Sequence, residues 1–368
     1  MRKFMTILGL FMVFSAVMPT RLSAGQPAAG KPVNLTFASV AGSVYYFPAY
    51  VAREKGWFGE AGLNLREVGF TNGPVMVESL ASNGWDVGMS GIGGILPGVL
   101  AYDGVLLTPV NSDDGTQYLF VRNDSPIVAA GTGKNSLDPR IYGDADSWKG
   151  KRVLCNTGAV LQYFLIKVLG GFNLKPGDVQ FMAMDVATAG SAFRAGEGDI
   201  VAMTGSGGAL QMLNDKDEYT AVAHGPWAKT GLMSACFANK NSLADPVKRE
   251  AMLIFLKVYH DAVAWIADKN NYETTVNMMM DFSDEMGNAF DRPTAAAYLA
   301  LDPFYTMREA VDMMTAKAPG KNYSVMEDNL INVLNFFIDS GSRRQGDAEK
   351  FLGHVDPSLM SELANRVK

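Results

Sequence analysis

Met89-Ser90-Gly91-Ile92-Gly93-Gly94 is repeated later in the chain as Met203-Thr204-Gly205-Ser206-Gly207-Gly208, in the shared order Met, hydroxyl residue, Gly, any residue, Gly, Gly. We call these segments glycine turn 1 and glycine turn 2. Each follows an apolar run that begins with an aspartate, Asp86 or Asp199, and each is followed by an apolar pair. The sequence therefore predicts, twice, a buried strand, a glycine turn and the start of a helix.

A turn of this kind is suited to ligand binding. The first amides of a helix have no intrahelical partner and carry a partial positive charge. Glycines let these amides approach a bound group, and the hydroxyl of Ser90 or Thr204 adds a donor. Two such turns facing each other form a polar clamp. The alternative is a tight strand-to-helix connection whose glycines serve packing alone, and the duplication favours the clamp.

A longer order of elements is repeated around the glycine turns, which indicates two similar halves. The first half is predicted to contain a strand at 35–38, a turn at 39–43, a helix near 49–51, a strand at 65–70 and a helix near 75–80. The second is predicted to contain a strand at 153–155, a turn at 156–158, a helix at 161–169, a strand at 179–184 and a helix near 189–194. This alternation predicts two α/β domains with parallel-dominated sheets flanked by helices. Ligands of such sheets bind beyond the carboxyl ends of the strands, so these turns are candidate site loops.

The domain boundaries follow from the elements between the halves. Strands at 105–110 and 118–121 are expected to complete the first sheet. We therefore assign 33–121 together with 235–368 to domain 1, and 122–234 to domain 2.

The chain is expected to return to domain 1 through a strand at 234–238. Asp245-Pro246 is a helix-start signal, and apolar residues then recur at three- and four-residue spacing from Met252 to Ile266, which predicts one long helix. Two crossing segments would form a hinge near residues 122 and 234, with a cleft between the domains.

The N-terminus has the pattern of a secretory signal peptide. Arg2 and Lys3 precede an apolar run from Phe4 to Met18, and Leu22-Ser23-Ala24 supplies small residues for cleavage. The alternative, a membrane anchor, is disfavoured because the run is short for a bilayer. We expect a signal peptide at 1–24, a linker at 25–32 and a periplasmic protein.

Composition narrows the classes of partner. Without residues 1–24 the chain keeps 29 of its 32 basic residues against 38 acidic ones, a net charge of −9. This acidity argues against a nucleic-acid partner. The two cysteines, Cys155 and Cys236, both lie in apolar runs, and either a disulfide or two buried thiols fits them.

Motifs for enzyme chemistry are missing from the sequence. The three histidines, His224, His260 and His354, are far apart, and there is no zinc-binding His-Glu-x-x-His, paired Cys-x-x-Cys, nucleophile elbow or P-loop. We therefore expect no enzyme, no cofactor and no metal site.

The candidate loops offer amides, hydroxyls and aromatic rings but no charged side chain. Helix N-termini favour an anionic group, and the aromatics suit an apolar or planar body. Asp185 either caps a helix or pairs with an amine of the ligand, and Trp227 either closes over the cleft or lies in the core. The predicted ligand-binding residues are Ser39, Ala41, Ser43, Tyr45, Ser90, Gly91, Asn156, Thr157, Gly158, Asp185, Thr204, Gly205, Ser206 and Trp227.

Several of these segments together resemble a known family. The order Ala52-Arg53-Glu54-Lys55-Gly56-Trp57-Phe58, Gly62-Leu63 and Trp85-Asp86-Val87-Gly88 resembles the ABC-transporter substrate-binding proteins for nitrate, sulfonates, taurine and thiamine precursors. Lys149-Gly150-Lys151-Arg152-Val153 is similar to that family's entry into its second domain, and Val355-Asp356-Pro357 to its C-terminal end. The resemblance implies a two-domain periplasmic binding protein fold of type II.

The resemblance also implies a function. It predicts a monomeric receptor that closes on a small-molecule ligand, a small organic anion of sulfonate or taurine type, and delivers it to an ABC permease in the inner membrane. Glycine turn 2 departs from the family, since many members have an aromatic residue and a proline there, and no arginine for a sulfonate is evident. A neutral or aromatic solute such as a pyrimidine vitamin precursor is therefore an alternative ligand. A ligand-sensing partner of a membrane sensor is an alternative role, whereas export argues against a pyrimidine-precursor synthase.

Overall fold

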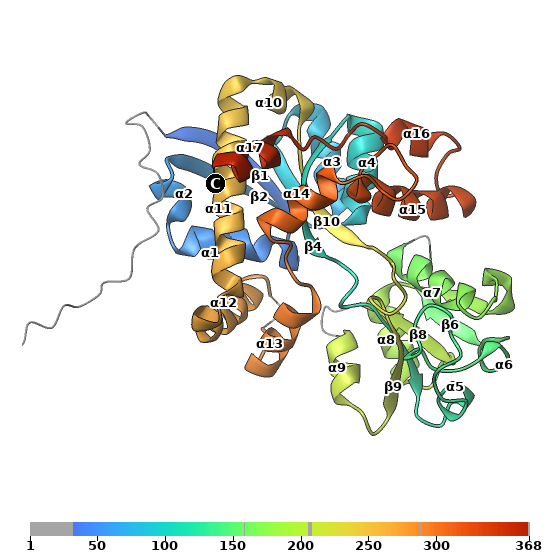
Figure 1. The fold of residues 1–368 in the computed structure, drawn as a ribbon. Coiled ribbons are helices and arrows are strands. Elements are labelled where there is room, and N and C mark those ends of the chain that lie inside the picture. Colours follow the sequence, from blue (N-terminus) through green and yellow to red (C-terminus); the bar gives the residue numbers. More distant parts are fainter. Residues whose placement is uncertain (1–31, 158, 205–207, 288, 367–368) are drawn as a thin grey trace, which may run out of the picture.

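The computed structural model describes residues 32–157, 159–204, 208–287 and 289–366. The predicted signal peptide at 1–24, and the linker up to residue 31, lie outside these residues. The described residues form two lobes, each built around a five-stranded sheet with helices packed on it (Figure 1). We call the lobe with the first sheet lobe 1 and the lobe with the second sheet lobe 2.

The elements alternate as the repeat predicts. The strands are β1 Val33–Val40, β2 Leu63–Phe70, β3 Val87–Ser90, β4 Val105–Ser112, β5 Tyr118–Arg122, β6 Arg152–Cys155, β7 Gln180–Ala183, β8 Ile200–Met203, β9 Tyr219–His224 and β10 Met233–Ala238. The helices of the first half and the second half are α1 Phe47–Glu54, α2 Trp57–Glu60, α3 Gly73–Glu78, α4 Ile92–Tyr102, α5 Pro126–Ala129, α6 Ala145–Trp148, α7 Val160–Gly170, α8 Val186–Arg194 and α9 Gly208–Asn214. The C-terminal helices are α10 Lys240–Ala244, α11 Pro246–Ala267, α12 Tyr272–Glu285, α13 Arg292–Leu301, α14 Met307–Thr315, α15 Val325–Asp339, α16 Asp347–Phe351 and α17 Ser358–Arg366. Short 3-10 turns lie at η1 Val44–Tyr46, η2 Ser79–Ser82, η3 Pro176–Asp178 and η4 Lys269–Asn271.

The two sheets have the same topology. Their strand orders are β2-β1-β3-β10-β4 and β7-β6-β8-β5-β9. In each sheet three strands pair in parallel, and the fourth position is taken by a strand, β10 or β5, that pairs antiparallel with both of its neighbours. The predicted parallel-dominated α/β architecture and its duplication are therefore confirmed.

The aspartate before each glycine-turn strand has the same structural role in both lobes. Asp86 accepts a hydrogen bond from the backbone N–H of Thr36 on β1 at 2.8 Å. Asp199 accepts one from the backbone N–H of Arg152 on β6 at 2.8 Å. Each carboxylate thus ties the third strand of its half to the first, which explains why the sequence pattern begins with an acid.

Strand β5 corrects one prediction. The sequence places 118–121 in the first sheet, but β5 pairs with β8 and β9 of the second sheet. An apolar strand fits either sheet, and residues 113–117 are long enough to carry the chain across before it begins. The chain therefore crosses between Ser112 and Tyr118, and crosses back between His224 and Met233.

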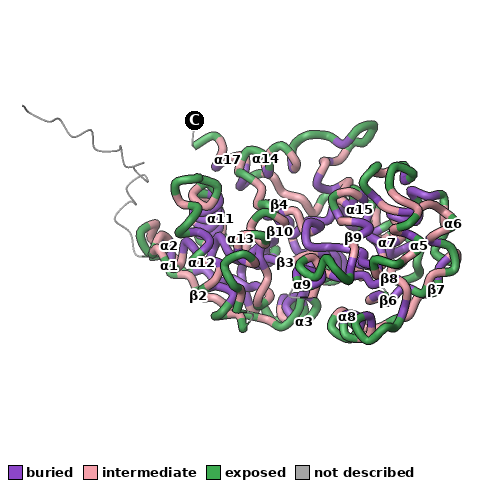
Figure 2. Tube along the Cα trace, turned by 90° about the horizontal axis from the view of Figure 1, so that it is seen from below, coloured by how far each residue is buried: buried purple, intermediate pink, exposed green. Residues whose placement is uncertain are grey.

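The predicted return to lobe 1 is confirmed. β10 inserts between β3 and β4, and α11 begins after Asp245, whose side chain accepts hydrogen bonds from the N–H groups of Val247 and Lys248. Buried residues follow both sheets and the inner faces of the covering helices (Figure 2). Among the described residues, no helix has the length and apolar character needed to cross a bilayer.

The two cysteines lie in different lobes. Cys155 is on β6 and Cys236 on β10, and both are buried free thiols. Burial raises the pKa of Cys155 to about 12. Of the two alternatives left open by the sequence, the structure contains the unpaired thiols.

Candidate ligand-binding site

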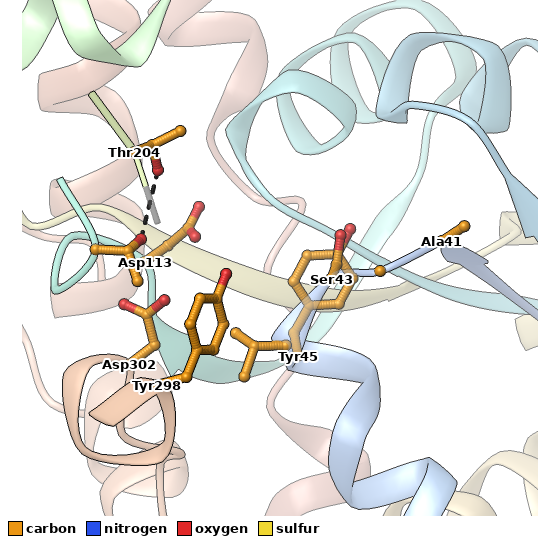
Figure 3. A pocket seen from close by; sticks show the side chains of 10 residues that line it. Ala41, Ser43, Tyr45, Asp113, Thr204, Tyr298 and Asp302 are labelled. Atoms are coloured by element: carbon orange, nitrogen blue, oxygen red, sulfur yellow. Dashed lines mark hydrogen bonds between the residues drawn. The ribbon is translucent and has the colours of Figure 1, made fainter. Parts of the chain in front are cut away.

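A cavity of about 250 Å³ lies where the two lobes meet the crossing segments (Figure 3). Lobe 1 contributes the loop after β1, lobe 2 contributes the end of β8, and helix α13 closes one side. The described residues that line the cavity are Ala41, Gly42, Ser43, Val44, Tyr45, Asp113, Thr116, Thr204, Tyr298 and Asp302.

The loop after β1 supplies the lobe 1 wall. Strand β1 ends at Val40, and the chain turns through Gly42, which has a φ of 75° that glycine adopts without strain. This turn brings Ser43 and Tyr45 to the cavity. Burial raises the pKa of the Tyr45 hydroxyl, and hydrogen bonds with Ser43 and Ser90 offset this in part.

Glycine turn 1 lies beside this wall. Gly91 caps α4, and a methyl group added to it would lie 2.9 Å from Oδ2 of Asp113, so glycine lets the carboxylate approach the helix start. Ser90 is 2% exposed and its Oγ packs against Gly94, where an added methyl would lie 2.4 Å away. Ser90 therefore supports the turn from beneath.

Thr204, which follows β8 at the start of glycine turn 2, lines the same cavity. The hydroxyl of Thr204 lies 3.4 Å from that of Thr116, so the end of β8 meets the first crossing segment (Figure 3). Gly205 and Ser206, predicted to bind the ligand, lie outside the described residues.

The two crossing segments are bonded to each other beside the cavity. The N–H of Asp113 donates to the carbonyl of Leu232 at 3.0 Å, and the N–H of Gly225 donates to the carbonyl of Gln117 at 2.9 Å. Asp114 adds side-chain bonds, since it accepts from the hydroxyls of Ser112 at 2.6 Å and Thr230 at 2.9 Å. Asp114 is thereby a structural tie.

Helix α13 presents Tyr298 and Asp302 to the same space. Asp302 follows the last residue of α13 and is 2% exposed, and its Oδ1 accepts from the N–H of Gly115 at 3.1 Å. Gly115 is required there, because an added methyl would lie 1.5 Å from the carbonyl oxygen of Leu301. This close approach places Asp302 against the first crossing segment.

The site is acidic. Burial and the negative charge of Asp114 raise the pKa of Asp113 to about 7. Burial, followed by the charges of Asp113 and Asp114, raises the pKa of Asp302 to about 8. Other titratable groups near this pair are His224, whose pKa burial lowers, and Tyr45, Tyr118, Tyr298 and Tyr305, whose pKa burial raises.

Three buried side-chain oxygens near the first crossing segment and β10 make no hydrogen bond among the described residues. They belong to Asn111, Gln117 and Ser234, and each of these residues is at most 2% exposed. A methyl added to Gly91 would lie 3.7 Å from the Oγ of Ser234 as well as 2.9 Å from Oδ2 of Asp113. None of these three residues is among the described residues that line the cavity.

Of the predicted site residues, Ala41, Ser43, Tyr45 and Thr204 line the cavity. Ser39, 7% exposed, lies buried near the end of β1. Asn156 is half-buried and Thr157 exposed beyond β6, neither is among the described residues that line the cavity, and Gly158 is outside the described residues.

The sequence left a structural role and a ligand-binding role open for Asp185 and for Trp227, and the structure shows the contacts of both side chains. Asp185 is exposed and caps α8, accepting from the N–H of Thr188 at 2.9 Å. The Trp227 ring packs edge-on to His224 at 5.5 Å and lies under the Arg140 guanidinium at 5.0 Å. Neither is among the described residues that line the cavity.

Sequence reasoning missed the acids. The predicted loops hold no charge, but the site also takes Asp113 from the crossing segment, and Asp302 with Tyr298 from α13. A signal existed for Asp113, because Asp113-Asp114-Gly115 comes two residues after the predicted strand at 105–110. Nothing in the sequence links Asp302 to the cleft, since it comes from the C-terminal helices.

Among the described residues, no three His, Cys, Asp or Glu side chains lie close enough together to hold a metal ion.

No family model matches the chain. A Brachyspira hyodysenteriae protein, provisionally named an ABC transporter periplasmic binding protein, is 23% identical over 260 residues, which cover 69% of this chain and 71% of that protein. The resemblance seen in the sequence is confirmed by this similarity and by the solved structures below.

Three solved structures share the fold. The periplasmic aliphatic sulphonate binding protein SsuA from Escherichia coli superposes with a TM-score of 0.66 at 18% identity, covering 89% of this chain and 94% of SsuA. The periplasmic nitrate-binding protein NrtA from Synechocystis PCC 6803 gives a TM-score of 0.61 at 12% identity, covering 91% and 89%. The desulfurization enzyme DSZB gives 0.56 at 12% identity, covering 91% and 100%. The chain has the periplasmic binding protein fold, which these proteins use for different ligands and, in one case, for catalysis.

Proposed function

We propose that this chain is a periplasmic receptor that binds a small solute between its lobes and delivers it to the permease of an ABC importer. The observation that carries this proposal is the cavity itself, which takes residues from both lobes at the carboxyl ends of β1 and β8. The similarity to periplasmic binding proteins supports it.

Binding would act by closure of the lobes around the crossing segments. A ligand that contacts Tyr45 in lobe 1 and Thr204 in lobe 2 stabilises the closed arrangement by contacts that an open form lacks. A second contact between the lobes supports this view: the ring of Tyr163 on α7 packs against Phe336 on α15 at 5.1 Å. Separation of the lobes would break the ligand's bridge from Tyr45 to Thr204 and also the contact between Tyr163 and Phe336.

The ligand class expected from the sequence is a sulfonate or taurine. The similarity to a sulphonate-binding protein favours it. The cavity argues against a simple anion, because Asp113 and Asp302 line it and none of its described lining residues is basic. Taurine, which carries an amine beside its sulfonate, fits these acids better than an alkanesulfonate, and a neutral solute such as a pyrimidine vitamin precursor stays an alternative.

The test is a thermal-shift screen of residues 25–368 against sulfonates, amines, carboxylates, nitrate and pyrimidines. A ligand at 100 times its Kd adds about 2.7 kcal/mol of stability, which raises the melting temperature measurably. We expect one class to raise it and to reduce the radius of gyration in small-angle X-ray scattering. Binding without compaction would contradict the closure mechanism.

A substitution tests whether the ligand binds in this cavity. Thr204→Tyr fills the cavity from lobe 2 and should abolish binding while the protein still folds, because Thr204 is only half-buried. Thr274→Tyr, on the exposed surface of α12, is the matched control. Equal affinity of the two variants would place the site elsewhere. Turnover of the bound compound, assayed in the same screen, would favour the enzyme alternative that the fold of DSZB raises.

A further inference from the structure

We infer that the bound solute carries a cationic nitrogen, held by Asp113 and Asp302 and enclosed by the rings of Tyr45 and Tyr298. This inference rests on the proposed receptor function and names the class of its ligand. It departs from the expectation of a simple organic anion.

The first support is a pair of acidic groups without a basic partner. Asp113 and Asp302 both line the cavity, and within the described part of the chain neither forms an ion pair. Asp302 is buried and Asp113 half-buried, and a carboxylate with little access to water is either paired or neutralised. Without a cation these two groups take up protons instead, and a cation bound between them replaces those protons.

Asp114 provides an internal comparison. It is buried beside the other two, but its oxygens accept hydrogen bonds from Ser112 and Thr230, which accounts for its presence. Asp302 accepts hydrogen bonds from the backbone N–H of Gly115 and from the side chain of Thr116, whereas the Asp113 carboxylate accepts none from the described residues. The fold therefore uses Asp114 as a structural tie and leaves the Asp113 carboxylate without a protein partner at the cavity.

The second support is the aromatic lining. Tyr298 lies on the same side of the cavity as the two acids, and Tyr45 lies opposite, beside Ser43 (Figure 3). Tyrosine faces attract ammonium groups within about 6 Å of the ring centroid. The cavity of about 250 Å³ suits a small amine or zwitterion.

Matched pairs of compounds test the inference. Taurine and isethionate differ in an ammonium against a hydroxyl, and choline and 3,3-dimethylbutan-1-ol differ in the charge of the head group. Isothermal titration with ethanolamine, putrescine and both pairs should show binding of at least one compound with a cationic nitrogen. For taurine or choline, the partner that lacks this nitrogen should bind at least ten-fold more weakly. Tight binding of isethionate or 3,3-dimethylbutan-1-ol would refute the inference of a cationic ligand but would leave the proposed receptor function standing.

Variants locate the cation. Asp302→Asn and Asp113→Asn should each weaken binding about 10- to 100-fold, the range for a hydrogen bond to a charged group. Asp217→Asn, an exposed acid of lobe 2, removes the same charge and should change nothing. Equal loss in Asp217→Asn, or no loss in both site variants, overturns the assignment. Failure of every cationic probe, with a neutral or anionic solute bound and the lobes compacted, also refutes the cation while the receptor stands; failure of all classes refutes the receptor as well.

Discussion

Replacing Asp302 with asparagine should stabilise the ligand-free protein at alkaline pH and leave its stability unchanged near pH 4. The Asp302 side chain is almost completely buried, and its pKa is raised from 3.8 to about 8 by burial and then by the charges of Asp113 and Asp114. Between these pH values the folded chain holds a proton that the unfolded chain has released. The free energy of unfolding of the wild type therefore falls as the pH rises from about 4 to about 8, and the full penalty is present above pH 8.

The size of the effect follows from the shift. A rise from 3.8 to about 8, at about 1.36 kcal/mol per pKa unit, sets an upper bound of about 6 kcal/mol. Asparagine keeps an acceptor for the N–H of Gly115, but its buried amide group needs a partner and Asp113 keeps its own charge. We therefore expect a gain of about 2 kcal/mol at pH 8.5, or about 4 °C in Tm.

Urea unfolding at pH 4.5 and pH 8.5 measures this difference. The comparison is between wild type, Asp302→Asn and the exposed control Asp217→Asn, because acid titration elsewhere affects all three alike. A gain for Asp302→Asn at pH 8.5 that vanishes at pH 4.5 supports the reasoning. The same gain at both pH values, or a loss at pH 8.5, would refute it.

Three further predictions concern binding and the crossing segments. Affinity for a cationic ligand should rise between about pH 6 and pH 8, because the pKa of Asp113 is about 7 and that of Asp302 about 8. An anion should bind more weakly as the pH rises over the same range. Titration calorimetry across this range shows whether the affinity rises or falls. Gly115→Ala should destabilise the fold by about 3 kcal/mol, since its methyl would lie 1.5 Å from a carbonyl oxygen at the end of α13, and chemical denaturation measures this loss. Tyr163→Ala removes the contact with Phe336, 5.1 Å away, and should shift the ligand-free protein towards an open form, seen as a larger radius of gyration; an unchanged radius would show that this contact does not hold the lobes.

The sequence predicted the architecture because its signals are local. The alternation of strands and helices, the acid before each glycine-turn strand and Asp245-Pro246 at the start of α11 depend on periodicity and capping within a few residues. The repeated order of elements then indicated that the two halves of the chain fold alike. Such local signals could not predict which sheet β5 joins. Its apolar residues fit either sheet, and only the pairing with β8 and β9 decides between them.

The same division holds for the site. The sequence by itself determined the loops that build it, including Ser43, Tyr45 and Thr204, because loops at the carboxyl ends of parallel strands converge whatever their side chains. Only the tertiary structure decided the electrostatics, because Asp302 reaches the cleft from a helix far along the chain and meets Asp113 through a glycine contact that no local pattern encodes. Electrostatic interactions join residues that are far apart in the sequence, and burial depends on how the whole chain packs. The acidic character of the cavity could therefore be recognised only in the folded structure.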